Sequence, residues 1–201
     1  MSEFERWETR FAAPEYVFGK APNAFLKSHA HLLKRGQKAL AIADGEGRNG
    51  VFLAERGLDV HSIDFSPKAI AKAQALAKER GVKIHAEQAD IFTWSWPTAS
   101  YDVIVGIFFQ FASPDLRTQL FNNIKKALKK GGLLLIQGYR PKQLEYKTGG
   151  PSQVENLYTR ELLENAFKDF SSLEIREHDS AVDEGGGHKG MSALIDLVGR
   201  K

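Results

Sequence analysis

The stretch KALAIADGEGRNG, residues 38–50, decides the fold class of this chain. A short apolar run is followed directly by a turn with glycines at positions 45, 47 and 50, and then by a helical pattern. Glycine is needed where the backbone takes a positive φ or where a bulky ligand approaches it closely. A G-x-G-x-x-G turn between a strand and a helix is typical of α/β sheets that bind nucleoside ligands.

The same alternation of apolar runs and helical patterns continues outward from this turn. Strands alternating with helices indicate a parallel sheet covered by helices. A further helix is predicted at 22–34, before the first strand. The alternating part has predicted strands at residues 38–43, 59–63, 82–86, 101–105 and 133–136, and predicted helices that end at Gly57, Gly81 and Gly131. The last two of these helices open with Ser66-Pro67 and Ser113-Pro114, an N-cap followed by proline at the first helical position.

The last third of the chain changes this rhythm. Thr159 is predicted to cap a helix, and strands follow at 172–178 and 191–198, joined by the glycine-rich loop 183–188. Two strands joined without a helix must pair antiparallel, because a parallel return needs a long crossover. The predicted fold is therefore α/β: a three-layer, doubly wound, mostly parallel seven-stranded sheet with an antiparallel C-terminal strand.

The length of 201 residues predicts a single domain, 1–201. Residues 1–36 are expected to form an N-terminal lid and helix, and 37–140 a cofactor-binding core. Residues 141–201 are expected to form an acceptor-side loop, a helix and the terminal strand hairpin.

Composition excludes several classes of protein. With 42% hydrophobic and 26% charged residues the chain is globular, and its net charge of +3 is too scattered to favour a nucleic-acid partner. No apolar run reaches 18 residues, and the first ten residues do not resemble a secretory signal, so no membrane partner is expected. The absence of cysteine excludes disulfides and a thiol nucleophile. A cytoplasmic monomer is predicted.

Acidic residues in the glycine turn discriminate between two nucleoside ligands. A dinucleotide places its pyrophosphate at the N-terminus of the helix, where N–H groups favour an anion. Here that position carries Asp44 and Glu46, which would repel a pyrophosphate. They suit a ligand with an ammonium and a sulfonium group, so the turn favours S-adenosylmethionine over a nicotinamide dinucleotide.

Acids also follow the second and third predicted strands. Asp64 comes 19 positions after Gly45, where a carboxylate can accept both hydroxyls of a ribose, and the adjacent Phe65 can lie against adenine. Asp90 can accept from the adenine amine while Ile91 packs on the ring. The structural alternatives are an acid at a helix N-terminus for Asp64 and a turn-forming aspartate for Asp90.

This arrangement resembles the class I S-adenosylmethionine-dependent methyltransferases from about Leu40 to Val198. Asp64, Asp90, the strand start Tyr101-Asp102 and the stretch 128–132 stand where that family has its ligand acids and its glycine turn. The final antiparallel strand pair is also similar to that family.

Within the class, residues 45–49 and 52–57 look like the small bacterial tellurite-resistance and thiopurine methyltransferase-like group, as do 188–190 and 197–201. The chain departs from the pattern at Ala41, where the family has an acid, and at Ala43, where it has a glycine. The nearest acid is Asp44, which the resemblance then assigns to the methionine amino group.

Further candidates lie beyond the fourth predicted strand and before the first. Gly106 and Ile107 are expected on the loop after that strand, bordering the sulfonium, and Tyr16 lies in the predicted lid. The complete set of predicted cofactor-binding residues is Tyr16, Asp44, Gly45, Glu46, Gly47, Asn49, Asp64, Phe65, Asp90, Ile91, Gly106 and Ile107.

Catalysis is assigned to His188 and Arg48. His188 lies on the predicted glycine-rich loop, and with Arg48 or Lys189 it is expected to bind or deprotonate an anionic or acidic acceptor. A solvated loop histidine is the structural alternative. The remaining histidines show no zinc-type spacing, and His29 and His31 are two apart on a predicted helix, so no metal is predicted.

The predicted function is methyl transfer from S-adenosylmethionine to a small soft or anionic acceptor by in-line displacement. A chalcogen oxyanion, a thiol or a related metabolite is preferred, and a small-molecule hydroxyl comes next. Two alternatives stay open: a nicotinamide-dependent oxidoreductase, and an adenosylmethionine-binding protein without catalysis.

Overall fold

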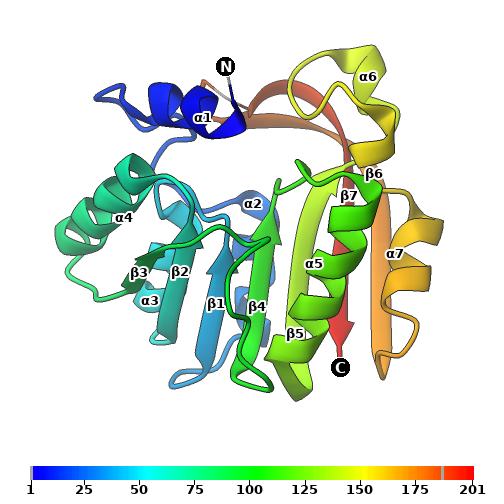
Figure 1. The fold of residues 1–201 in the computed structure, drawn as a ribbon, viewed down its shortest axis with the longest axis horizontal. Coiled ribbons are helices and arrows are strands. Elements are labelled where there is room, and N and C mark those ends of the chain that lie inside the picture. Colours follow the sequence, from blue (N-terminus) through cyan, green and yellow to red (C-terminus); the bar gives the residue numbers. More distant parts are fainter. Residues whose placement is uncertain (1, 187) are drawn as a thin grey trace. The chain divides into compact units, whose positions relative to one another are not determined.

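The computed structural model describes residues 2–186 and 188–201, whose strands form one seven-stranded sheet in the order β3-β2-β1-β4-β5-β7-β6 (Figure 1). The pairs β1–β2, β2–β3 and β4–β5 are parallel, whereas β7 runs antiparallel to β5. The predicted fold class and its antiparallel C-terminal strand are confirmed. The chain divides into two compact units, Met1–Trp94 with Glu184–Gly187, and Ser95–Asp183 with His188–Lys201.

The first unit contains the glycine turn and three strands. The capping expected at Ser66 is present, because its hydroxyl accepts a hydrogen bond from the Ala69 N–H and Pro67 opens the helix. The elements are α1 (Glu3–Phe11), α2 (Ala24–Ser28), the 3-10 turn η1 (Ala30–Leu32), β1 (Lys38–Ile42), α3 (Arg48–Glu55), β2 (Asp59–Asp64), α4 (Pro67–Glu79) and β3 (His85–Gln88).

Two predicted elements of this unit are wrong in their extent. The third strand begins at His85 rather than at Val82, because Val82 and Ile84 pack against a helical cluster of Val51, Leu76 and Ala77. The helix predicted at 22–34 is divided into α2 and η1.

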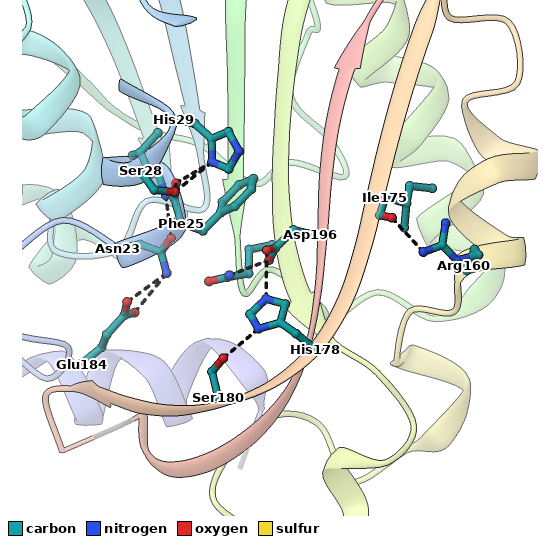
Figure 2. Close-up of polar contacts among 12 residues, drawn as sticks. Asn23, Phe25, Ser28, His29, Arg160, Ile175, His178, Ser180, Glu184 and Asp196 are labelled. Carbon is teal, nitrogen blue, oxygen red and sulfur yellow. Dashed lines mark hydrogen bonds and ion pairs between the residues drawn. The ribbon is translucent and has the colours of Figure 1, made fainter. Parts of the chain in front are cut away.

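The division of that helix has a local cause. The Ser28 hydroxyl donates to the Phe25 carbonyl at 2.8 Å, and the His29 ring Nδ1 bonds the same carbonyl at 2.9 Å (Figure 2). Side chains that bond the backbone in this way compete with continuation of a helix. In addition, α1 forms at residues 3–11, where no helix was predicted, with Ser2 and Glu5 making a capping box.

The second unit has strands longer than predicted. Its elements are β4 (Tyr101–Ile107), α5 (Pro114–Ala127), β5 (Leu128–Tyr139), α6 (Gln143–Tyr146), the 3-10 turn η2 (Val154–Asn156), α7 (Arg160–Ala166), β6 (Ser172–Glu184) and β7 (His188–Arg200). The helix expected to end at Gly131 ends at Ala127, because Leu128 already pairs with Tyr101 in the sheet. Leu116 on this helix is exposed.

Among residues 2–186 and 188–201, no helix combines the length and the apolar character that crossing a bilayer requires.

Candidate active site

The glycine turn is built for close packing. Gly47 has φ +85°, and a Cβ atom there would lie 2.5 Å from the Ala73 Cβ and 2.7 Å from the Ala73 Cα on α4. At Gly50 a Cβ would meet the carboxylate of Asp44. The turn therefore places the first residues of α3 directly against α4 and against the end of β1, as the G-x-G-x-x-G pattern predicts.

Asp44 is buried immediately after β1. Its carboxylate accepts hydrogen bonds from the Gly50 N–H, at 3.2 and 3.1 Å to its two oxygens, and from the Ser62 hydroxyl at 2.7 Å. Burial raises the pKa of Asp44 to about 7, and repulsion from Asp64 adds to the effect, although these hydrogen bonds and the Arg48 charge oppose it. Near neutral pH this side chain is therefore poised between its two protonation states.

Asp64 ends β2 and is also buried. Its Oδ2 accepts from the Gly45 N–H at 2.9 Å, and its Oδ1 accepts from the Ser66 N–H at 3.0 Å. Burial raises the pKa of Asp64 to about 6 against the opposing effect of these backbone donors. The carboxyl is thus fixed beside the glycine turn, in the place predicted for a ribose-binding acid.

A pH dependence of folding follows from these two carboxyls. Each has a folded-state pKa above that of an unfolded aspartate, so the folded chain binds protons more tightly. Their stabilising contribution is fully present below about pH 4 and is lost as the pH rises through about 6 and 7. We expect Asp44→Asn, which cannot ionise, to gain stability relative to the native chain over this window, by on the order of a few kcal/mol.

Urea unfolding at pH 4.5 and pH 8 measures this gain as a change in the stability difference between variant and native chain. Glu3→Gln, at an exposed position, is the control. The difference in free energy of unfolding between this variant and the native chain should not vary with pH in the same way. A difference for Asp44→Asn that is equal at both pH values would contradict the high pKa of Asp44.

The N-terminal segment packs onto the carboxyl ends of β1 and β2. Glu8 accepts from the Ser66 hydroxyl and, at 3.2 Å, from the Lys68 N–H. The Phe11 ring lies 3.5 Å from the position of a Cβ at Gly45. Further along the segment, the Val17 N–H donates to Glu46 at 2.7 Å. Within this unit, the segment predicted as a lid covers the glycine turn.

Three predicted cofactor-binding residues make hydrogen bonds that hold this N-terminal segment in place. Glu46 is buried and also accepts from the Lys72 ammonium at 2.6 Å. The Asn49 Oδ1 accepts from the Asn23 N–H at 2.9 Å, and the Tyr16 hydroxyl donates to the Lys72 carbonyl at 3.0 Å. These hydrogen bonds join them to other protein groups, which sequence spacing could not reveal.

The residues predicted to contact the adenine ring, Phe65, Asp90 and Ile91, differ in burial and in their contacts. Phe65 makes an edge contact with Phe4 of α1, with ring centroids 5.7 Å apart. Asp90 is exposed, and its carboxylate accepts from the Phe92 N–H at 2.9 Å, so it does form the turn that was its structural alternative. Ile91 beside it is buried.

Arg48 opens α3 and forms a buried ion pair. Its guanidinium donates to Glu184 at 2.7 Å, and the two side chains are only 8% and 12% exposed. Glu184 also accepts from the Asn23 side-chain amide at 3.0 and 3.2 Å (Figure 2) and from the Ala24 N–H at 3.1 Å. The geometry thus gives Arg48 a role in holding residues 184–186 against the N-terminal segment.

In the second unit, Gly106 and Ile107 lie within β4 rather than on the loop after it. They pair with Ile136 and Gln137 of β5, which extends the strand by two residues beyond the prediction. The chain turns at Phe108, which has φ +55°.

The loop after this turn is fixed by the buried Gln110. Its amide donates to the Tyr139 carbonyl at 2.7 Å and to the Asn156 carbonyl at 3.3 Å. The side chain therefore joins β5 to the segment before α7.

His188 is the first residue of β7, and it is buried rather than exposed on a loop. Its Nδ1 hydrogen-bonds the Tyr139 hydroxyl, and its ring stacks on Phe108 with centroids 4.4 Å apart. Phe108 also stacks on Tyr139 at 4.7 Å. The alternative of a solvated loop histidine is therefore wrong. The neighbouring Lys189 is exposed, and its ammonium lies 3.6 Å from the Asp183 carboxylate.

A second histidine network lies in the same unit. His178 contacts Asp196 through Nε2 at 2.9 Å and Ser180 through Nδ1 at 2.8 Å (Figure 2). Asp196 in turn accepts from the Gln137 amide at 2.6 Å. This network joins β5, β6 and β7 and was not anticipated.

Sequence reasoning missed several residues that shape these sites. Ser62 and Glu184 act through long-range partners, and no local pattern marks either of them. The contact of Tyr139 with His188 depends on the antiparallel pairing of β5 with β7.

Comparison with known proteins agrees with this geometry. Residues 39–132 match the model of the methyltransferase domain family. The ribosomal protein L11 methyltransferase of Campylobacter concisus is 26% identical over 177 residues, which cover 84% of this chain and 54% of that protein. The 2-heptyl-1-hydroxyquinolin-4(1H)-one methyltransferase of Mycobacteroides abscessus is 23% identical over 190 residues, which cover 90% of this chain and 84% of that protein.

Solved structures share the fold at low sequence identity. TehB from Haemophilus influenzae has a TM-score of 0.74 and 21% identity, covering 98% of this chain and 66% of that one. A SAM-dependent methyltransferase from Aquifex aeolicus has a TM-score of 0.65 and 16% identity, covering 100% of this chain and 99% of that one.

The fold and the glycine turn define a class I methyltransferase architecture. The methyltransferase domain matched over residues 39–132 and the methyltransferase relative from Campylobacter concisus are similar to this chain in the same region. The chain spans about half the length of the Campylobacter concisus relative.

Proposed function

We propose that this chain transfers a methyl group from S-adenosylmethionine to a small soft or anionic acceptor, such as a chalcogen oxyanion, a thiol or a related metabolite. The observation that carries the donor assignment is the pair of buried carboxyls, Asp44 and Asp64, beside the glycine turn. When ionised, they attract a ligand with ammonium and sulfonium groups and repel the pyrophosphate of a dinucleotide.

The residues present fit this donor. A carboxylate offers about four acceptor sites, and the Gly45 and Ser66 N–H groups use one on each oxygen of Asp64, so the group keeps capacity for a ribose hydroxyl. Asp44 supplies negative charge for the methionine amino group. S-adenosylmethionine, when bound, supplies an electrophilic methyl group on a positively charged sulfur.

The tasks of the chain itself are to orient the reactants and to exclude water. Alignment alone can lower a barrier by about 7–11 kcal/mol, and an acceptor that is already anionic needs no base. The N-terminal segment, with Phe11 beside Gly45, is the part of the first unit that would shield the donor from solvent.

A hydroxyl group on a small aromatic molecule is the second candidate acceptor. Two observations favour it: the buried His188 hydrogen-bonded to Tyr139, and the relative from Mycobacteroides abscessus, whose name describes a hydroxyquinolinone substrate. A hydroxyl benefits from a base, typically by about 10²- to 10⁴-fold. His188 is the residue we assign to that role.

A product screen tests the function. Purified protein is incubated with donor labelled in the methyl group and with tellurite, selenite, small thiols, phenols or N-hydroxyquinolinones. We expect labelled product and stoichiometric S-adenosylhomocysteine with at least one acceptor. Donor binding without any product would instead support the alternative of an adenosylmethionine-binding protein.

The variant His188→Gln distinguishes a hydroxyl acceptor from a thiolate or an oxyanion acceptor. With a hydroxyl acceptor we expect kcat to fall by about 10²- to 10⁴-fold, whereas with a thiolate or an oxyanion it should change only a few-fold. His178→Gln, which alters the other hydrogen-bonded histidine of the same unit, is the matched control. Unchanged turnover of a hydroxyl acceptor in His188→Gln would remove this histidine from the chemistry.

A further inference from the structure

A cluster of two histidines and a glutamate lies on β2 and the adjacent edge strand β3. His61 and His85 are partners in the parallel register of these strands, with ring centroids 4.5 Å apart. Glu87 follows two positions after His85, so it lies on the same face of β3. Its Oε2 is 2.8 Å from the His61 Nε2 and 3.9 Å from the His85 Nε2.

The cluster faces away from the glycine turn. The Ser62 side chain points toward α3, where its hydroxyl meets Asp44 and its Cβ lies near Gly50. Because successive side chains of a strand point to opposite faces, His61 lies on the other face of the sheet. The cluster is thus separate from the site proposed for the methyl donor.

Trp94 completes the surroundings of the cluster. Its indole lies edge-on to the His61 ring, with centroids 5.5 Å apart, and its Nε1–H donates to the Glu87 Oε1 at 3.1 Å. One carboxylate oxygen is therefore held by the indole while the other points toward the imidazoles. Partners of this kind orient the ligands in protein metal sites.

We propose that His61, His85 and Glu87 bind a divalent transition-metal ion, with Zn²⁺ as the best match. One candidate ligand atom from each residue lies within 4.8 Å of the others. Imidazole nitrogens suit zinc and its neighbours in the first transition series, whereas Mg²⁺ and Ca²⁺ prefer oxygen ligands. Two histidines with one glutamate form a known three-ligand zinc set that leaves a fourth position for water.

The geometry requires only a small adjustment. Ligand bonds of about 2.0–2.2 Å at a tetrahedral ion place the ligand atoms about 3.3–3.6 Å apart. The His61 Nε2 and the Glu87 Oε2, now 2.8 Å apart, must therefore separate slightly, whereas the His85 Nε2, 3.9 Å from that oxygen, must move closer. The His85 side chain is 71% exposed and can rotate to close the site, whereas the more buried His61 provides a fixed ligand. The positive charge of the nearby Lys38 acts on His61 and repels a cation there. This repulsion lowers the affinity of the proposed site for the metal ion.

A bound ion would join two strands at an edge of the sheet. The edge strand β3 has only four residues and no fully buried side chain. An ion that binds the folded chain stabilises it by mass action, in proportion to the logarithm of metal concentration over Kd. The proposed ion would therefore stabilise this edge of the sheet, at a place separate from the site proposed for the methyl donor.

Calorimetry with Zn²⁺ on the untagged full chain tests the proposal, and the d–d absorption of Co²⁺ reports the ligand set. We expect one ion per chain and a higher melting temperature in its presence. His85→Ala and Glu87→Gln should each weaken zinc binding by at least tenfold. Trp94→Phe, which keeps the ring but loses the N–H, should weaken it by about 10- to 100-fold.

His31→Ala is the matched control. His31 is an exposed histidine of the same unit whose ring lies 6.1 Å from that of His29, so it represents adventitious surface binding. Its removal should leave the affinity unchanged. The proposal is overturned if the native chain binds no stoichiometric zinc, or if His85→Ala and Glu87→Gln, shown to be folded by their melting curves without metal, bind it as the native chain does.

Discussion

Asp64→Asn is expected to weaken the binding of S-adenosylmethionine by about 10- to 100-fold. The carboxylate is held by the Gly45 and Ser66 N–H groups, so its position does not depend on the ligand. Hydrogen bonds to a charged group contribute about 1.5–3 kcal/mol, and the cationic donor loses the attraction of a nearby negative charge. Calorimetric titration of the donor into native and variant protein at pH 7.5 measures the loss.

The pH dependence of binding gives an independent check on the same residue. In the native chain, affinity for the donor should rise between about pH 5 and pH 7.5, as carboxyls with pKa values of about 6 and 7 ionise. In Asp64→Asn the increase in donor affinity around pH 6, which reports the ionisation of Asp64, should disappear. The exposed Glu79→Gln is the control for a general loss of charge and should bind like the native chain. Native-like affinity in a folded Asp64→Asn would exclude Asp64 from the donor site.

Gly47→Ala is expected to lower the free energy of unfolding by about 3 kcal/mol or more. At φ +85° an alanine pays about 1–2 kcal/mol of backbone strain. Its Cβ would also lie 2.7 Å from the Ala73 Cα, and overpacking against backbone costs a further 1–3 kcal/mol or so. Urea unfolding near neutral pH measures the combined effect.

Gly81→Ala separates the two contributions. Gly81 also has a positive φ, +68°, but a Cβ there meets nothing within 4 Å. This control should therefore show the strain alone, reduced by the smaller entropy of the unfolded alanine chain. Equal destabilisation by the two substitutions would show that a Cβ atom at position 47 has room beside Ala73, against the 2.7 Å approach to its Cα.

Local elements were predictable because their causes are local. The strand–turn–helix at 38–55, the Ser66 cap and the antiparallel ending all follow from side-chain periodicity, glycine spacing and the absence of a crossover. Errors arose where a residue had a stronger distant partner. Val82 packs with the helical cluster instead of extending the third strand, and Leu128 pairs with Tyr101 instead of continuing its helix.

The candidate site was predictable only in part. The positions of Asp44 and Asp64 at the ends of their strands follow from the motif, whereas their high pKa values come from burial that the sequence does not show. Glu46 and Asn49 fit the same motif, yet they bind the N-terminal segment through Val17 and Asn23.

By itself, the sequence determined the fold class, the order of the elements and the acidic character of the glycine turn. These properties depend on residue types within a few positions of one another. Only the tertiary structure decided that His188 is buried beside Tyr139 and that His61 meets His85 across two strands. Such contacts depend on which strands pair and in which register, and residues far apart in the chain carry no local signal of that pairing.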